Sequence, residues 1–210
     1  MEAFRTDVFL HARKMWEAGL VVGSSGNVSS RVDAAHIAIT PTSIPYDSLT
    51  PEEIVLVEIE SGRAVESIRE PSYELPMHLT IYRSRPDVGA IVHTHAPFVT
   101  TLSVLRRPLP PIIDEMAVTL GGAIEVTDYA FTGTDAVGIN VIRTLGERAG
   151  VLLANHGNVC IGRDLAHALH VAIAMEAAAR VYVQALQIGE PIPLPDQSVL
   201  AGRRMYEQRK

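Results

Sequence analysis

The sequence contains a single cysteine and no long run of basic residues. Cys160 has no partner in the chain, so an intrachain disulfide is excluded, which fits a reducing compartment. Basic residues adjoin each other only in short pairs such as Arg106-Arg107 and Arg203-Arg204, whereas nucleic-acid binding requires larger clusters of cations. We therefore expect a cytoplasmic protein that does not bind nucleic acid.

Segments that would carry the chain to or across a membrane are also missing from the sequence. The first five residues are amphipathic rather than basic and then apolar, so no signal peptide is evident. No stretch approaches the roughly 20 uncharged apolar residues that span a bilayer. We expect no membrane-spanning segment.

The length and composition are those of one ordinary globular domain. A chain of 210 residues can bury one sizeable core and is short for two. Hydrophobic residues make up 47% of the chain and charged residues 20%, both typical values. The net charge of −6 does not exclude an anionic substrate, because backbone amides and a metal ion can set the local field. We predict a single domain over residues 1–210.

Hydrophobic periodicity predicts helices in alternation with short strands. The expected helices cover residues 2–19, 72–83, 97–105, 134–147 and 164–188. The expected strands cover residues 28–32, 36–40, 54–59, 88–93 and 124–126, followed by a strand pair over 151–161. We interpret the segment beyond Pro195, which includes Lys210, as a frayed helix rather than a lid. This alternation predicts an α/β fold with a mixed or mostly antiparallel sheet covered by helices.

Three histidines lie where predicted strands end. His93 and His95 are two residues apart at the end of an apolar strand, where such side chains point to the same face. His156 lies at the turn that interrupts the last strand pair. Three neutral imidazoles match a catalytic zinc site with an open position, although cobalt, manganese and iron also accept imidazole. We interpret the three residues as a divalent metal site; the alternative is histidines that bind nothing.

The remaining histidines show no such arrangement. Three of them lie in predicted helices, namely His11, His167 and His170. The other two, His36 and His78, have no convergent partner in the sequence pattern. We expect all five to be structural.

Two polar features could complete a site, and both have ordinary alternatives. Glu74 falls in the first turn of the helix that Ser72 is expected to cap, where the helix dipole favours a negative charge, so it could equally be a solvated helix-end residue. The segment Gly23-Ser24-Ser25-Gly26-Asn27 exposes amide N–H groups and hydroxyls that could donate to an anion, but it could also be a simple turn.

Five segments taken together resemble the class II aldolase/adducin family, the group that contains fuculose-phosphate aldolase. Each segment alone is weak, but their order and spacing match over residues 4–195. They are Gly23-Ser24-Ser25-Gly26-Asn27-Val28-Ser29-Ser30-Arg31, Ile39-Thr40-Pro41-Thr42-Ser43-Ile44-Pro45-Tyr46, Pro71-Ser72-Tyr73-Glu74, His93-Thr94-His95 and Asn155-His156-Gly157.

The resemblance implies both an architecture and a site. It implies a three-layer α/β/α fold with a mostly antiparallel central sheet, and a four-fold symmetric homotetramer with active sites between subunits. It implies Zn²⁺ held by His93, His95 and His156, and Glu74 as a further ligand or as a base that swings away; Mn²⁺ and Co²⁺ stay open as alternatives on the chemistry of imidazole ligands. The family's phosphate-binding residues correspond to Asn27, Thr42, Ser43, Ser72 and Tyr73.

This chain departs from fuculose-phosphate aldolase at three positions. Ser43 stands where that enzyme has glycine, and Tyr73 stands where it has a second serine. Glu115 aligns with its tyrosine proton donor and looks more like the acid/base of the methylthioribulose-phosphate dehydratase branch. A carboxyl donates a proton at neutral pH only if its pKa is raised, by burial or by a neighbour such as Asp114. The alternative for Glu115 is a surface charge.

The resemblance favours reversible aldol cleavage of a ketose 1-phosphate, of the fuculose-phosphate or 5-deoxyribulose-phosphate type, to dihydroxyacetone phosphate and an aldehyde. Glu74 and Glu115 are the expected catalytic carboxylates. The first alternative is dehydration of methylthioribulose 1-phosphate, and related epimerase or decarboxylase chemistry is a further one. A metal-free, adducin-type binding domain is disfavoured because all four candidate ligands are present.

Overall fold

The computed structural model describes residues 2–208 and contains one seven-stranded sheet, in the order β4-β3-β2-β1-β5-β7-β6. Every strand pairs antiparallel with its neighbours. The strands are β1 Asn27–Arg31, β2 His36–Ile39, β3 Val55–Glu58, β4 Ala64–Glu66, β5 Ala90–Thr94, β6 Gly150–Leu153 and β7 Gly157–Gly162. The expected mostly antiparallel sheet is confirmed.

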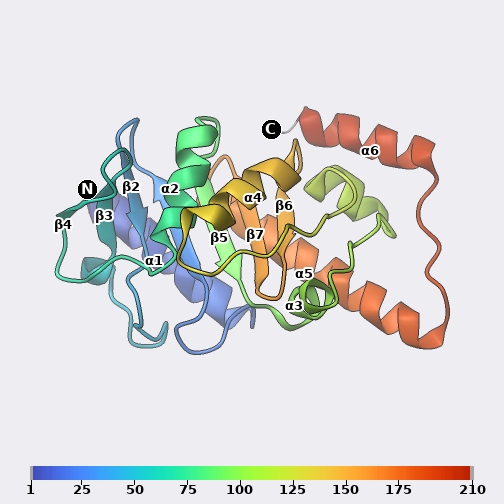
Figure 1. The fold of residues 1–210 in the computed structure, drawn as a ribbon, viewed down its shortest axis with the longest axis horizontal. Helices are drawn as coiled ribbons and strands as arrows, with labels where there is room; N and C mark the ends of the chain where they lie inside the picture. The colour runs from blue at the N-terminus through green and yellow to red at the C-terminus, as the bar shows by residue number, and fades with distance from the viewer. Residues whose placement is uncertain (1, 209–210) are drawn as a thin grey trace.

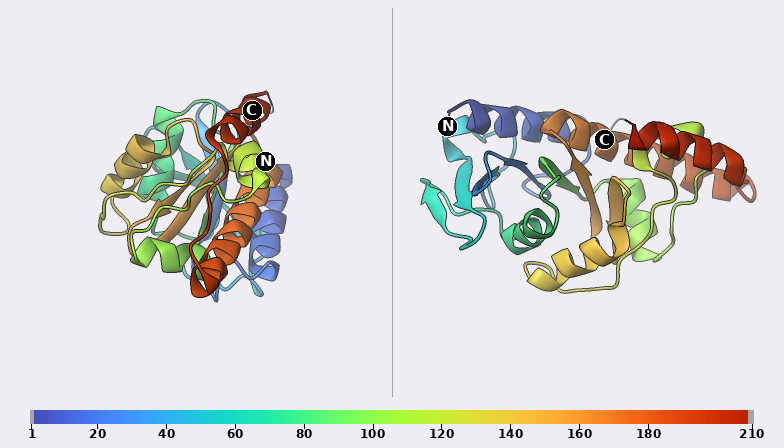
Figure 2. Two further views of the ribbon diagram at one scale, coloured as in Figure 1. Left: turned by 90° about the vertical axis from the view of Figure 1, so that its right-hand side faces the viewer. Right: turned by 90° about the horizontal axis from the view of Figure 1, so that it is seen from above.

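Helices cover both faces of this sheet and give three layers (Figures 1 and 2). Helices α1 (Glu2–Glu17) and α5 (Leu165–Ile188) lie on one face, with α3 (Pro97–Val104) and α6 (Asp196–Glu207) on the same side. Helices α2 (Leu75–Ser84) and α4 (Asp135–Leu145) pack together on the other. Two short helical turns, η1 (Pro51–Glu53) and the π-helix η2 (Met116–Leu120), complete the fold.

Alternation along the strands builds a separate hydrophobic core on each face. On β5, Val92 packs toward α1 and α5, whereas Ile91 packs toward α2 and α4. Residues two apart on a strand share a face, so His93 continues the Ile91 side. The sheet thereby places His93 beneath the start of α2.

The predicted strand at residues 124–126 is wrong, because the structure forms only isolated bridges there. Ile124 pairs with Leu109, and Val126 pairs with Leu152. Leu109 is flanked by Pro108 and Pro110, which have no N–H to donate, so the pairing cannot extend into a ladder. The sequence interpretation also missed β4 and η2.

Helix α5 is long and apolar enough to cross a membrane by length and composition alone. The expectation concerned uncharged stretches, and α5 contains Glu176 and Arg180. It lies along the sheet in Figure 2, and Ala168, Ala172 and Met175 are buried against it. These contacts identify α5 as the core helix of this fold. The cytoplasmic location stays a prediction.

The C-terminal segment is an ordered helix rather than the frayed one that we expected. Helix α6 packs on η2, with Tyr206 only 4% exposed. Gly202 allows this approach, because a Cβ there would lie 2.5 Å from the Cβ of Ala117. Lys210 lies outside the described residues.

Candidate metal centre

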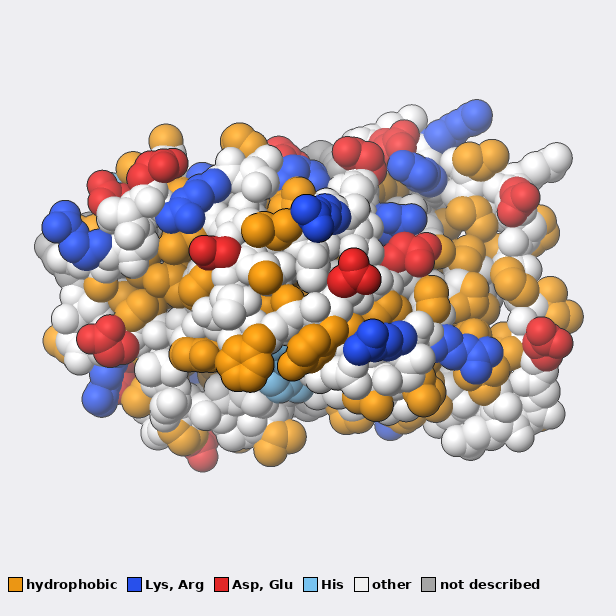
Figure 3. Space-filling model, in the orientation of Figure 1, with side chains coloured by type: hydrophobic (Ala, Val, Ile, Leu, Met, Phe, Trp, Pro, Cys, Tyr) orange, Lys and Arg blue, Asp and Glu red, His pale blue; other side chains and the backbone are white. Residues whose placement is uncertain are grey.

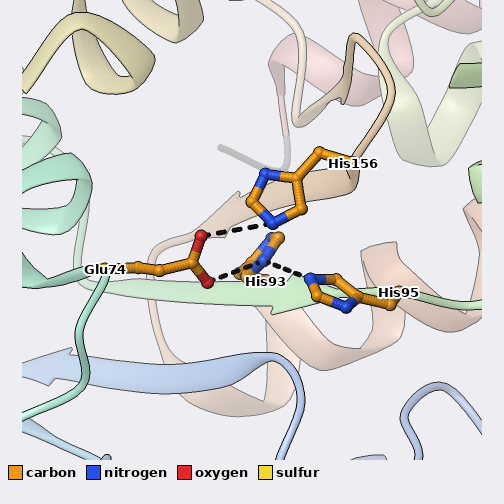
Figure 4. A group of neighbouring side chains, drawn as sticks. All are labelled: Glu74, His93, His95 and His156. Atoms are coloured by element: carbon orange, nitrogen blue, oxygen red, sulfur yellow. Dashed lines mark hydrogen bonds and ion pairs between the residues drawn. The ribbon is translucent and has the colours of Figure 1, made fainter. Parts of the chain in front are cut away.

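Four side chains from three parts of the fold converge at the end of β5 (Figure 4). His93 lies on β5, His95 just beyond it, His156 in the turn between β6 and β7, and Glu74 directly before α2. The Nε2 atom of His93 lies 2.9 Å from Glu74 Oε2 and 2.9 Å from His95 Nε2. His156 Nε2 lies 3.3 Å from Glu74 Oε1. All four ligand atoms lie within 4.8 Å of one another.

Two glycines let the neighbouring loops approach β5 this closely. Gly26 has a φ of 72°, and a Cβ on it would lie 2.6 Å from the carbonyl oxygen of His93. A Cβ on Gly157 would lie 2.2 Å from the carbonyl oxygen of Thr94. Asn155, before His156, adopts a φ of 58°, which asparagine tolerates better than most residues. The sequence around the cluster is therefore dictated by backbone sterics as well as by ligand chemistry.

The donor set fits a divalent metal ion. His93 Nδ1 lies 2.8 Å from the carbonyl oxygen of Asn158, so this nitrogen carries the proton and Nε2 directs its lone pair at the cluster. Ligand atoms around a tetrahedral zinc at roughly 2.0–2.1 Å lie about 3.3 Å apart. The shorter separations within the cluster, 2.9 to 3.3 Å, are close to that value.

The electrostatics of the cluster favour a neutral imidazole at His95 and at His156 beside a charged Glu74 carboxylate. Burial, reinforced by the neighbouring His93, lowers the pKa of His95 to about 3 and that of His156 to about 4. Burial alone would raise the pKa of Glu74, but His93 and then His156 and Thr132 hold it well below its usual range. Burial opposes a charge on His93, yet the Glu74 carboxylate raises its pKa. The lone pairs of His95 and His156 are free at neutral pH.

Glu74 is fixed by two residues that sequence reasoning did not connect with it. Thr132 Oγ1 donates to Glu74 Oε1 at 2.8 Å, and Asn27 Nδ2 donates to Oε2 at 2.8 Å. Only 8% of Glu74 is exposed, which rules out the solvated alternative. No pattern in the sequence marks Thr132, because it lies in a loop whose position depends on the tertiary fold.

The predicted start of α2 is wrong by two residues. Glu74, rather than Ser72, is the N-cap residue, and Pro76 occupies the first turn, where proline is favoured. The Ser72 hydroxyl accepts the Glu74 N–H at 3.3 Å, so it stabilises the turn before the helix. Glu74 is thus free to point at the histidines instead of along the helix.

All five residues predicted to bind phosphate line one cleft with the cluster. The cleft residues that matter here are Asn27, Thr42, Ser43, Ser72, Tyr73, Glu74, His95 and His156. Asn27 and Ser72 are buried, whereas Ser43 and Tyr73 are exposed. The structure therefore joins the candidate anion loop to the candidate metal ligands in a single cavity.

Tyr73, one of the departures from fuculose-phosphate aldolase, occupies space that a glycine leaves free. A Cβ on Gly133 would lie 2.2 Å from the Tyr73 ring. Tyr73 is 60% exposed as a residue, and its ring contacts the loop that carries Thr132. The tyrosine ring thus packs against Gly133, while Tyr73 remains one of the residues that line the cleft.

Glu115 does not lie in this cleft within its own chain. Glu115 and Asp114 are both exposed and directly precede η2. Among the residues that the structure describes, those that line the cleft beside the four ligands include neither Asp114 nor Glu115. A role for Glu115 at this site therefore requires a second subunit.

The expectation that His78 has no convergent partner is wrong. Its Nε2 atom lies 2.5 Å from Asn27 Oδ1, and its Nδ1 atom lies 2.6 Å from Ser29 Oγ. His36, given the same prediction, contacts Asp33 at 3.0 Å near the surface. The four-residue spacing of Glu74 and His78, which puts both on one helix face, was the signal available in the sequence.

Two apolar hollows adjoin the cluster. Tyr129 and Phe131 line one beside His156, and Val104 and Leu105 line another beside His95. In Figure 3, histidine atoms surface between hydrophobic side chains on this face of the molecule. The surroundings of the cluster thus combine a polar cleft with exposed apolar walls.

Known proteins share both the sequence pattern and this fold. The model of the class II aldolase and adducin N-terminal domain matches residues 6–183. The chain is 37% identical over 193 residues to a 5-methylthioribulose-1-phosphate/5-deoxyribulose-1-phosphate aldolase of Rhodospirillum rubrum, covering 92% of this chain and 86% of that protein. It is 38% identical over 181 residues to an L-fuculose phosphate aldolase of Escherichia coli O6:H1, covering 86% and 83%.

The structural comparison agrees. The solved structure of an L-fuculose 1-phosphate aldolase superposes with a TM-score of 0.92 at 33% identity, over 98% of this chain and 96% of that one. The match extends over the sheet, both helical layers and the segment beyond residue 183. This chain belongs to the class II aldolase/adducin family.

Proposed function

We propose that the protein cleaves a ketose 1-phosphate reversibly to dihydroxyacetone phosphate and an aldehyde. The observation that carries this proposal is the single cleft in which His95, His156 and Glu74 meet Asn27 and the Gly/Ser loop. An aldol substrate needs both a metal for its carbonyl end and donors for its phosphate. The relatives named above, which are aldolases for fuculose, deoxyribulose and methylthioribulose phosphates, support the substrate class.

The metal ligands in this proposal are His93, His95, His156 and Glu74, with zinc as the first choice and manganese or cobalt as alternatives. The bound ion would supply Lewis-acid stabilisation of the negative charge that develops when the carbon–carbon bond breaks. The three imidazoles are held by the sheet and its turns, so they need no rearrangement at the moment of reaction.

Glu74 would act as a metal ligand in one orientation and as a base in another, and its surroundings give the carboxylate a different pKa in each. Among the histidines its lowered pKa makes it a good ligand and a weak base. Rotation away from His93 and His156 removes the charges that lower the pKa, while burial, which raises it, remains. In that position Glu74 would move the proton at the carbon next to the carbonyl, accepting it from dihydroxyacetone phosphate in the condensation direction and returning it to that carbon in the cleavage direction.

The phosphate group would lie at the other end of the cleft, at Asn27, Thr42, Ser43, Ser72 and Tyr73. Backbone N–H groups of Ser24 and Gly26 and the hydroxyls of Thr42 and Ser43 would supply donors without a cationic side chain. Asn27 lies between the two ends, because its amide already donates one hydrogen to Glu74. This arrangement supports a substrate whose phosphate and carbonyl are close together.

Glu115 would act from a neighbouring subunit of a homotetramer and exchange a proton with the aldehyde-side oxygen. Its exposure in one chain and its absence from that chain's cleft motivate this placement. Sedimentation equilibrium should give a mass of four chains. A monomer with full activity would contradict the shared site.

Dehydration of methylthioribulose 1-phosphate is the second candidate, and the carboxylate at Glu115 favours it. The two reactions differ in their products, because only aldol cleavage yields dihydroxyacetone phosphate. Zinc-loaded protein should therefore be incubated with fuculose, 5-deoxyribulose and methylthioribulose 1-phosphates, and the release of dihydroxyacetone phosphate should be measured.

In this assay His93→Ala is the control, and it should lose nearly all activity, because a buried ligand of the ion is removed. Release by the parent protein that disappears in His93→Ala would support the aldolase. Loss of water from the substrate with no dihydroxyacetone phosphate would replace it with the dehydratase.

A further inference from the structure

A chain of buried hydrogen bonds runs from Glu74 away from the cleft into the protein. Asn27 Nδ2 donates to Glu74 Oε2 at 2.8 Å, and Asn27 Oδ1 lies 2.5 Å from His78 Nε2. His78 Nδ1 lies 2.6 Å from Ser29 Oγ, which lies 2.9 Å from the hydroxyl of Tyr82. We call these four residues, Asn27, Ser29, His78 and Tyr82, the support chain; none is more than 2% exposed.

The regular spacing of these residues along β1 and α2 lets them meet where α2 packs over β1. Glu74, His78 and Tyr82 are spaced by four, so they follow one face of α2. Asn27 and Ser29 are spaced by two, so they share the face of β1 that α2 covers, and Asn27 is the cross-strand partner of His93. His78 on the helix therefore contacts both Asn27 and Ser29 on the strand, and Tyr82, one turn further along the helix, contacts Ser29.

The direction of every hydrogen bond follows from the carboxylate. An ionised carboxylate only accepts, so the NH₂ end of the Asn27 amide must face Glu74. The carbonyl end of that amide then faces His78, whose Nε2 must carry a proton to donate to it. In a neutral ring Nδ1 then accepts from Ser29, and Ser29 accepts from Tyr82. Burial, which lowers the pKa of His78 to about 3, agrees with the neutral ring.

The far end of the support chain is also held in place. The Arg31 guanidinium lies 4.9 Å from the centre of the Tyr82 ring and donates to the Tyr82 carbonyl oxygen at 2.9 Å. Arg31 continues the alternation of Asn27 and Ser29 on β1. No atom of the support chain is among the unpartnered buried side-chain atoms in the part of the chain that the structure describes.

We propose that His78 is a positioning residue that fixes the Asn27 amide and thereby orients Glu74 toward the three metal-binding histidines. Without the proton on His78 Nε2, the amide could turn its oxygen toward Glu74, and two acceptors would then face each other in a buried site. The inference rests on the proposed function in one respect, the identity of the ligand as a divalent ion. The effect of His78 on Glu74 should appear as a change in metal affinity, which can be measured without any substrate.

The test is the zinc affinity of the purified, metal-stripped protein, measured by competition with a chelator. His78→Phe keeps an aromatic ring but removes both nitrogens, and affinity should fall about 10- to 100-fold. His78→Gln keeps an N–H near the Nε2 position and should recover most of the loss, whereas His78→Asn, whose amide ends one bond earlier, should not.

Tyr82→Phe and its control test the far end of the support chain. Tyr82→Phe should lower zinc affinity several-fold, because Ser29 loses its donor. Tyr182→Phe removes a hydroxyl from another buried tyrosine, which contacts Arg107 at 3.1 Å outside the cleft, and should leave zinc affinity unchanged.

A purely structural role would lower the melting temperature of His78→Phe without changing its zinc affinity, and that result would overturn the proposal. If His78→Phe does not fold, Ser29→Ala takes its place, and unchanged affinity in that variant overturns the proposal equally. The result is independent of the reaction: an absence of dihydroxyacetone phosphate counts against the aldolase, whereas unchanged zinc affinity counts against the support chain.

Discussion

At the scale of single residues, the cleft contains one serine in an unfavourable backbone conformation. Ser43 has a φ of 60°, in the left-handed region that favours glycine. The resemblance to fuculose-phosphate aldolase implied a glycine in that enzyme at the corresponding position. A residue kept in such a conformation at a binding cleft suggests that its hydroxyl contributes to binding.

Replacement of Ser43 by glycine should separate stability from binding. We expect Ser43→Gly to raise the free energy of unfolding by up to about 1 kcal/mol, because relief of the backbone strain exceeds the added entropy of the unfolded chain. The KM for the ketose phosphate should rise several-fold as the hydroxyl is lost. Urea denaturation and steady-state kinetics measure the two effects.

The matched control is Ser48→Gly, another exposed serine whose φ is not positive. It should lose stability, as glycine usually does. Equal losses in both variants would show that Ser43 is not strained.

At the scale of elements, contacts between helices hold the ligand-bearing segments. Glu176 on α5 accepts the N–H groups of Phe98 at 3.0 Å and Val99 at 2.9 Å. Both N–H groups lie in the first turn of α3, where no carbonyl of the same helix can accept them, and α3 begins two residues after His95. A carboxylate from one helix thus caps another and holds the backbone next to a metal ligand.

The contact between α6 and η2 depends on a missing side chain, and it can be tested directly. Gly202→Ala adds a Cβ that would meet Ala117 at 2.5 Å. Alanine favours a helix by about 1 kcal/mol relative to glycine. The overpacking between α6 and η2 should nevertheless lower the free energy of unfolding by about 1–3 kcal/mol. Hydrogen exchange should show faster opening of residues 196–207.

The control for this change is Ser198→Ala, at an exposed position of the same helix. It should leave stability unchanged or slightly higher. If Gly202→Ala were stabilising as well, α6 would not be packed against η2 as the structure has it.

At the scale of the whole molecule, buried neutral histidines make the metal-free protein sensitive to acid. The pKa values of His78 and His95 are lowered to about 3 and that of His156 to about 4, first by burial. Below about pH 6.5 the unfolded chain binds protons at these positions while the folded chain does not. Glu74, whose pKa is lowered, acts in the same direction below its ordinary range, whereas His93, whose pKa is raised, acts in the opposite direction.

The stability of the metal-free protein should therefore fall as the pH decreases from 6.5 toward 4. Each buried histidine with a lowered pKa contributes roughly 1.4 kcal/mol per pH unit, and His93 offsets part of the sum. Urea denaturation between pH 7.5 and 4.5 measures the slope. A flat profile would contradict the burial of neutral imidazoles, and exposed His170→Gln should leave the slope unchanged.

The local sequence was sufficient to predict most helices and strands and the three histidines of the site. Short-range periodicity determines which face of an element is apolar, and strand ends at His93 and before His156 follow from it. The resemblance added the role of Glu74 at the metal and the phosphate-binding role of five residues of the cleft. Glu115 stays a prediction, because its contacts depend on a second chain.

Only the tertiary structure decided how Glu74 is held. Its partners Asn27 and Thr132 are 47 and 58 residues away in sequence, and the support chain behind Asn27 joins β1 to α2 in the same way. Such contacts depend on which strand lies beneath which helix, a property of the β1–β5 pairing and the packing of α2. Periodicity within one segment carries no information about that packing, which is why His78 was predicted to have no partner.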